Sequence, residues 1–143
     1  MSTAYCDDFY AWTQRQSELL RLGRLHDIDL ENLVEEISSL GERDKREVRS
    51  RLALVLMHLL KWQYQPTHRG ASWRCTINEQ RSELTLLFGD SPSLRRVAEE
   101  SLGKCYDIAR KRAADETGLA LSFFPEDSPW TLEQALAVGF LPN

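Results

Sequence analysis

An arginine and a histidine stand inside the most hydrophobic run of this chain. Residues 51–62 are RLALVLMHLLKW, which places Arg51 at the start of the run and His58 in its middle. Seven residues are close to two helical turns, so on a helix both side chains lie on one face, about 10 Å apart along the axis. An imidazole transfers protons near neutral pH, and a guanidinium stabilises charge on a phosphate. The two residues could therefore act on a phosphate ester without a metal ion.

Five further polar residues are candidates for the same interior or site. They are Gln16, Asp44, Gln80, Arg112 and Glu116. Asp44 belongs to the same helical column as the arginine and the histidine. The apolar stripes of three other predicted helices are interrupted by Gln16, Gln80 and Arg112. Glu116 lies one turn after Arg112 and is its natural ion-pair partner. Because unpaired buried charges are costly, we expect a hydrogen-bonded network that fixes helix register, or alternatively a ligand pocket.

Helical periodicity accounts for most of the chain that must position these groups. Apolar residues that recur at intervals of three and four predict four helices, roughly over 5–22, 30–64, 72–88 and 92–117. Suitable N-caps are Asp29, Ser72 and Ser91. Gly118 is a suitable C-terminal cap. The second helix is the longest, and a break at Gly41 is an alternative to one continuous helix.

The tail after residue 118 contains three prolines and one capping box, formed by Thr131 and Gln134. It predicts an extended strap with one short helix. We therefore expect an all-α, up-and-down helical bundle of about four main helices, with a long central helix and this Pro-rich C-terminal strap. A chain of 143 residues has the usual length of one domain, so we expect a single domain over 1–143.

Charge is distributed unevenly, although the net charge is only −4. The net charge is −5 over residues 1–41, +5 over residues 42–75 and −5 over residues 115–143. The acidic ends could fold against the basic middle and neutralise it. Alternatively, the basic segment 42–75 could bind nucleic acid, with the aromatic residues beside its basic loop as surfaces for stacked bases: Trp62, Tyr64 and Trp73.

The cysteines favour a reducing compartment. Cys6, Cys75 and Cys105 are odd in number, widely spaced and without a CxxC motif, so we expect free thiols in the cytoplasm. No Glu-x-x-His pair occurs, so no metal site is expected, and nothing indicates a cofactor. No run of about 18 apolar residues occurs, so we expect no membrane span.

Seven motifs in this order resemble one bacterial family: DFYAW, DLENLVEEI, SRLALVLMHLLKWQYQP, SWRCTINEQR, DSPSL, ADETGL and FPEDSPWTLEQAL. The family is the one catalogued as domain of unknown function twenty-nine, and the resemblance extends from Asp8 to Pro142. It implies a small, all-α protein from proteobacteria or cyanobacteria, and it implies no particular activity.

Three functions are compatible with these observations. The one we favour is a non-enzymatic module that binds another macromolecule, either another protein or a second copy of the chain. The first alternative is a metal-independent ribonuclease, because Arg51 and His58 are similar to the Arg-then-His helix motif of HEPN-type nucleases. Leu52 departs from that motif, which usually has a polar residue after the arginine. The second alternative is a small-ligand pocket, formed by residues Gln16, His58, Gln80 and Arg112.

Overall fold

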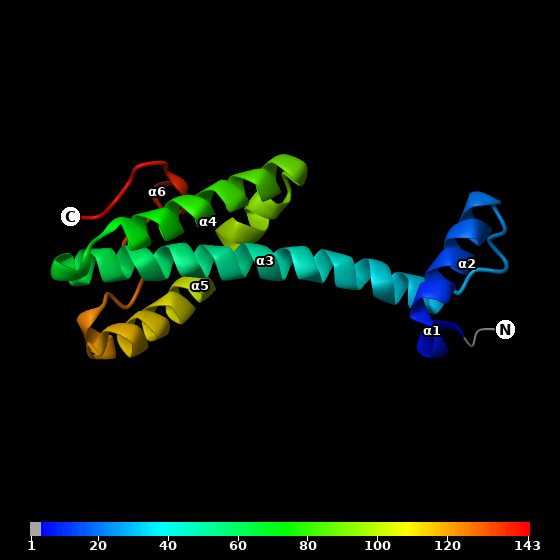
Figure 1. The fold of residues 1–143 in the computed structure, drawn as a ribbon, viewed down its shortest axis with the longest axis horizontal. Coiled ribbons are helices and arrows are strands. Elements are labelled where there is room, and N and C mark those ends of the chain that lie inside the picture. Colours follow the sequence, from blue (N-terminus) through cyan, green and yellow to red (C-terminus); the bar gives the residue numbers. More distant parts are fainter. Residues whose placement is uncertain (1–3) are drawn as a thin grey trace. The chain divides into compact units, whose positions relative to one another are not determined.

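The computed structural model describes residues 4–143, which form an all-α bundle with a long central helix (Figure 1). The elements are α1 (Ala4–Asp7), α2 (Phe9–Arg21), α3 (Leu30–Tyr64), η1 (Pro66–His68), α4 (Ala71–Asp90), α5 (Leu94–Thr117), η2 (Leu121–Phe123) and α6 (Leu132–Leu136). No β-strand occurs over residues 4–143, so the predicted fold class is confirmed. Helix α3 is continuous through Gly41, which decides between the two alternatives for that helix.

The chain divides into two compact units, Met1–Arg43 and Asp44–Asn143. We call them the N-terminal unit and the C-terminal unit. Helix α3 belongs to both, with residues 30–43 in the first and 44–64 in the second. The single domain over 1–143 stays a prediction, since one helix runs through both units.

In the N-terminal unit, polar side chains fix the turn between α2 and α3. Asp8 caps α2 by accepting a hydrogen bond from the amide of Ala11, so the predicted helix over 5–22 is divided into α1 and α2. The indole Nε1 of Trp12 donates to Asp29 at 3.0 Å, and the side chain of Gln16 accepts from the amide of Asp29 at 2.7 Å. Asp29 therefore starts α3, as predicted, and is itself held by α2.

The C-terminal unit has the hydrophobic core. Helix α4 lies beside the C-terminal part of α3 and α5 crosses it obliquely (Figure 1), and buried residues of all three helices form one cluster. The inward residues of α3 include Val48, Leu52, Val55 and Leu59, all with no exposed surface. Their spacing of four, three and four residues is that of an amphipathic helix with one buried face. This core sets the environment of His58, which lies one residue before Leu59.

The C-terminal strap follows the predicted design. Thr131 and Gln134 form the capping box of α6, and Gly118 ends α5 with a φ of 77°.

Two predicted helix starts were wrong. Helix α4 begins at Ala71 after Gly70, and α5 begins after Ser93, so neither Ser72 nor Ser91 is an N-cap.

Candidate functional site

Arg51 lies at the edge of the core, where it meets two helices. Its Nε donates to Glu47 at 2.9 Å, its Nη1 donates to Gln80 of α4 at 2.9 Å, and Glu83 lies 3.8 Å from its Nη2. The structure therefore brings Arg51 and Gln80 together. They line a shallow depression of about 450 Å³, and the guanidinium side chain is 27% exposed. Two carboxylates already neutralise this arginine, and they would repel a phosphate.

His58 is buried and makes its hydrogen bond within its own helix. Its Nδ1 lies 3.0 Å from the carbonyl oxygen of Leu54, and a carbonyl can only accept, so Nδ1 has the proton and Nε2 has the lone pair. Burial lowers the pKa of His58 below its ordinary value, and the charge of Lys61 lowers it further. His58 is therefore a neutral imidazole at neutral pH, and it does not line the depression beside Arg51.

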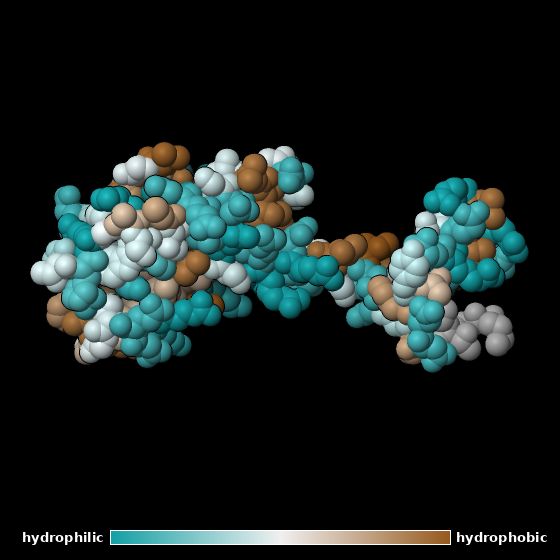
Figure 2. All heavy atoms as spheres, viewed as in Figure 1, coloured by the Kyte–Doolittle hydropathy of each residue, from teal (hydrophilic) through white to brown (hydrophobic). Residues whose placement is uncertain are grey.

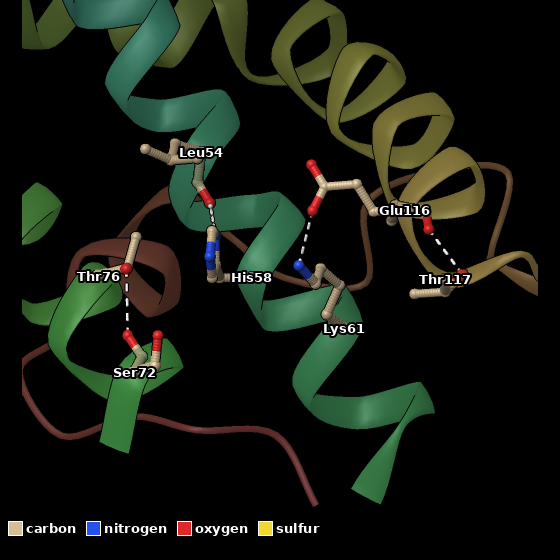
Figure 3. A network of polar contacts seen from close by, with 8 residues as sticks. Leu54, His58, Lys61, Ser72, Thr76, Glu116 and Thr117 are labelled. Atoms are coloured by element: carbon tan, nitrogen blue, oxygen red, sulfur yellow. Dashed lines mark hydrogen bonds and ion pairs between the residues drawn. The ribbon is translucent and has the colours of Figure 1, made fainter. Parts of the chain in front are cut away.

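Lys61 has the ion pair that was predicted for Arg112. Its Nζ donates to Glu116 of α5 at 2.8 Å and lies 4.9 Å above the ring of Trp73. Figure 3 shows Lys61 directed toward Glu116 and His58 on the side of α4. The polar groups of α3 thus divide between its two neighbouring helices.

Two predicted inward residues are exposed instead. Arg112 is on the surface, because the buried face of α5 passes through Ala109 and Ala113, four residues apart, and 112 falls outside it. Asp44 is exposed because the buried face of α3 begins one turn later, at Val48. Neither residue faces a shared polar interior.

Gln16 is buried, as expected, but its partner is local. It belongs to the N-terminal unit, where it accepts from Asp29, whereas His58, Gln80 and Arg112 belong to the C-terminal unit. Within the C-terminal unit, Gln80 joins Arg51, His58 bonds to its own helix, and Arg112 is exposed. The four residues therefore lie in separate surroundings.

One tryptophan of the basic segment, Trp62, is covered by arginines. Arg69 donates to the carbonyl of Trp62 at 2.6 Å, and the guanidinium groups of Arg69 and Arg74 lie 5.3 and 5.9 Å from the Trp62 ring. Trp62 is only 7% exposed, so a nucleic-acid base cannot stack on it.

Arg81 is a buried residue that the sequence did not single out, and it is only 3% exposed. It donates to the carbonyl oxygens of Ala135 at 2.7 Å and Phe140 at 3.0 Å, so it fastens the strap to α4. A signal was present, since Ile77, Arg81 and Leu84 follow the four-and-three spacing of a buried face. Its partners lie more than fifty residues later in the chain, so the sequence does not pair them.

The N-terminal unit has a groove between α2 and the first part of α3, which the sequence did not predict. Its volume is about 440 Å³, and its lining is mostly apolar: Phe9, Trp12, Thr13, Gln16, Ser17, Leu20, Leu33, Glu36, Leu40 and Arg43. Figure 2 shows hydrophobic side chains at the surface of the N-terminal part of α3. The sequence places these residues on one face of each helix, but it does not show that the face lacks a cover.

A family model described as domain of unknown function DUF29 matches residues 4–141. The chain belongs to the DUF29 family. No curated protein and no solved structure matches the chain.

The DUF29 chain has no described group of three or more His, Cys, Asp or Glu side chains that could hold a metal ion. None of the helices within residues 4–143 is both long enough and apolar enough to cross a membrane. What the DUF29 chain does have is a set of separate polar contacts around the core of the C-terminal unit and an open apolar groove in the N-terminal unit.

Proposed function

We propose that this DUF29 protein is a non-enzymatic module that binds another protein through its N-terminal unit. The binding surface is the groove between α2 and residues 30–43 of α3, together with the exposed apolar side chains of the same unit. One observation is the main support. Nine large apolar side chains of this unit are between 46% and 73% exposed: Phe9, Tyr10, Leu20, Leu22, Leu25, Leu30, Val34, Ile37 and Leu40.

Exposed apolar surface of this kind has a thermodynamic cost. Removing apolar surface from water is favourable by roughly 25 cal/mol per Å². Contiguous apolar patches on monomeric soluble proteins are rare and are typical of interaction sites. The groove is bounded by two helices, which suits a third helix whose apolar side chains recur every three or four residues.

The surroundings of the polar residues support a non-enzymatic role. Arg51 is paired with Glu47 and lies near Glu83, and His58 has its Nδ1 occupied and does not line the same depression. The ribonuclease alternative needs both side chains at one phosphate. The covered ring of Trp62 likewise argues against nucleic acid as the ligand.

We further infer a bacterial cytoplasmic setting. Cys6 and Cys75 are exposed free thiols, and Cys105 is a buried one. Exposed thiols persist as thiols in a reducing compartment.

Site-specific photocrosslinking in cells tests the proposed function. A photoreactive amino acid at position 40 lies in the groove, and one at position 112 is the exposed control on α5. We expect a protein adduct from position 40, none from position 112, and loss of the adduct when Leu20→Arg fills the groove. Equal adducts at both positions, or none at either, would exclude this groove as a docking surface.

A further inference from the structure

The first part of α3 has an exposed apolar stripe with the spacing of a helix–helix seam. Val34, Ile37 and Leu40 are 55%, 67% and 55% exposed. Leu33, Ile37 and Leu40 are separated by four and three residues, which is the repeat by which two helices pack along their length. Leu33 and Leu40 also line the groove. The stripe therefore fits another helix lying along α3.

The charges beside the stripe are of opposite sign on one flank. Glu36 and Arg43 both line the groove, and being seven residues apart they lie on the same side of the helix. The remaining acids of this part of α3, Glu31, Glu35 and Glu42, lie about 120–160° around the helix from Ile37, at the centre of the stripe. A helix packed on the stripe thus meets one acid and one base on this flank, and it does not meet the other acids.

This arrangement is complementary to itself. We propose that a second copy of this chain docks on the stripe in antiparallel orientation. A two-fold axis midway between residues 38 and 39 places Ile37 beside the partner's Leu40. The same register places Glu36 beside the partner's Arg43. The symmetry repeats each contact, so the interface contains two apolar layers and two ion pairs.

The same register gives Gly41 a role. It brings Gly41 opposite the partner's Val34, and a β-carbon added at Gly41 would meet no atom within 4 Å, so space is open there. Glycine in a helix interior costs roughly 0.5–1 kcal/mol relative to alanine. Because Gly41 has no side chain, the second helix can approach closely at this point. The open space accommodates the partner's Val34.

The charges beside the stripe, and not the net charge of the unit, are complementary to those of a second copy. The N-terminal unit has a net charge of −5 over residues 1–41, which opposes indiscriminate self-association. In the antiparallel register, Glu36 of each chain lies beside Arg43 of the other chain, so opposite charges meet at both ends of the interface. This inference rests on the proposed function, because it names the occupant of the same surface.

Charge reversal tests the register. Sedimentation equilibrium of the full chain is expected to give twice the 16.5 kDa chain mass at micromolar concentration. Glu36→Arg and Arg43→Glu each bring like charges together twice, so each is expected to weaken dimerisation at least about tenfold. The double variant Glu36→Arg/Arg43→Glu restores both ion pairs and is expected to recover the dimer. Ile37→Asp is expected to give a monomer.

Two controls separate the interface from folding. Glu35→Arg makes the same charge change on the opposite side of the helix and is expected to leave the dimer unchanged. Tyr5→Phe removes only the hydrogen bond that Tyr5 donates to Glu36 at 2.9 Å, so it isolates that contact from the charge reversal. Circular dichroism checks that every variant keeps its helix content.

Three results would overturn the second-copy proposal: a monomeric wild-type chain, single reversals without effect, or a double variant that does not recover. The crosslinking experiment keeps this outcome distinct from failure of the proposed function. A monomeric chain that still forms a specific adduct from position 40 with a different protein would retain the docking surface and exclude the second copy as its occupant.

Discussion

Ile37 and Leu59 belong to the same helix, yet Ile37 is 67% exposed and Leu59 has no exposed surface. Residues 44–64 of α3 pack against α4, α5 and the strap, so their apolar side chains are enclosed. Residues 30–43 share their unit with α1 and α2 alone. A helix with a broad apolar face needs neighbours on more than one side to bury it. The sequence pattern thus sets which face of α3 is apolar, and the number of neighbouring elements sets whether that face is buried.

Truncating one leucine in each unit gives the largest contrast. Leu59→Ala is expected to lower the free energy of unfolding by about 2–5 kcal/mol, because it removes buried methyl groups and leaves a cavity. Leu25→Ala, at a position 63% exposed in the N-terminal unit, is expected to change it by less than about 0.5 kcal/mol. Urea denaturation followed by circular dichroism measures both. Equal losses would mean that the face around Leu25 is covered in solution.

Removal of Arg81 tests whether the C-terminal unit depends on its buried charge. Arg81→Ala is expected to cost about 3 kcal/mol, because the carbonyls of Ala135 and Phe140 lose a charged donor. Arg96→Ala is the matched control, since its side chain is 82% exposed, and its loss is expected to be below about 0.5 kcal/mol. Hydrogen exchange should also quicken over residues 131–141. Unchanged exchange there would show that Arg81 does not hold the strap.

His58 predicts a pH dependence of the C-terminal unit. Its folded-state pKa lies below the ordinary 6.5, so the unfolded state takes up its proton first as the pH falls. Stability therefore decreases as the pH drops below 6.5 and levels off below the folded pKa. His58→Leu should remove this part of the slope, whereas His68→Leu, at an exposed position, should leave it in place. Thermal melts at several pH values below 6.5 measure this dependence. The same change of melting temperature with pH in the wild type and His58→Leu would contradict the burial of His58.

Local signals predicted much of the fold. The limits of α3, the capping box at Thr131 and the cap at Gly118 depend on neighbouring residues only, and the structure has all three. The prediction for Arg112 was wrong because successive buried residues of a helix can be three or four positions apart. Only the packing of α5 determines that Ala113, and not Arg112, follows Ala109 on the buried face. Arg81 was missed because its partners are distant in sequence.

The candidate site was less predictable than the fold for a related reason. Arg51 and Gln80 meet, but the sequence does not show that Glu47 and Glu83 also surround the guanidinium. The groove beside Leu40 depends on which helix faces lack a neighbour, and that property belongs to the assembled units. Periodicity identifies apolar faces and does not identify uncovered ones.

The smallest expected effect concerns Arg51. Arg51→Ala removes the bonds to Glu47 and Gln80, but the side chain is 27% exposed and solvent screens it. We therefore expect the free energy of unfolding to fall by less than about 1 kcal/mol.

A fluorescent RNA incubated with the wild type, Arg51→Ala and His58→Ala is expected to be cleaved at the background rate in every case. Arg112→Ala controls for the loss of an exposed arginine. Cleavage by the wild type and by Arg112→Ala that disappears in both other variants would favour the ribonuclease, since a stability loss this small in Arg51→Ala cannot abolish an activity.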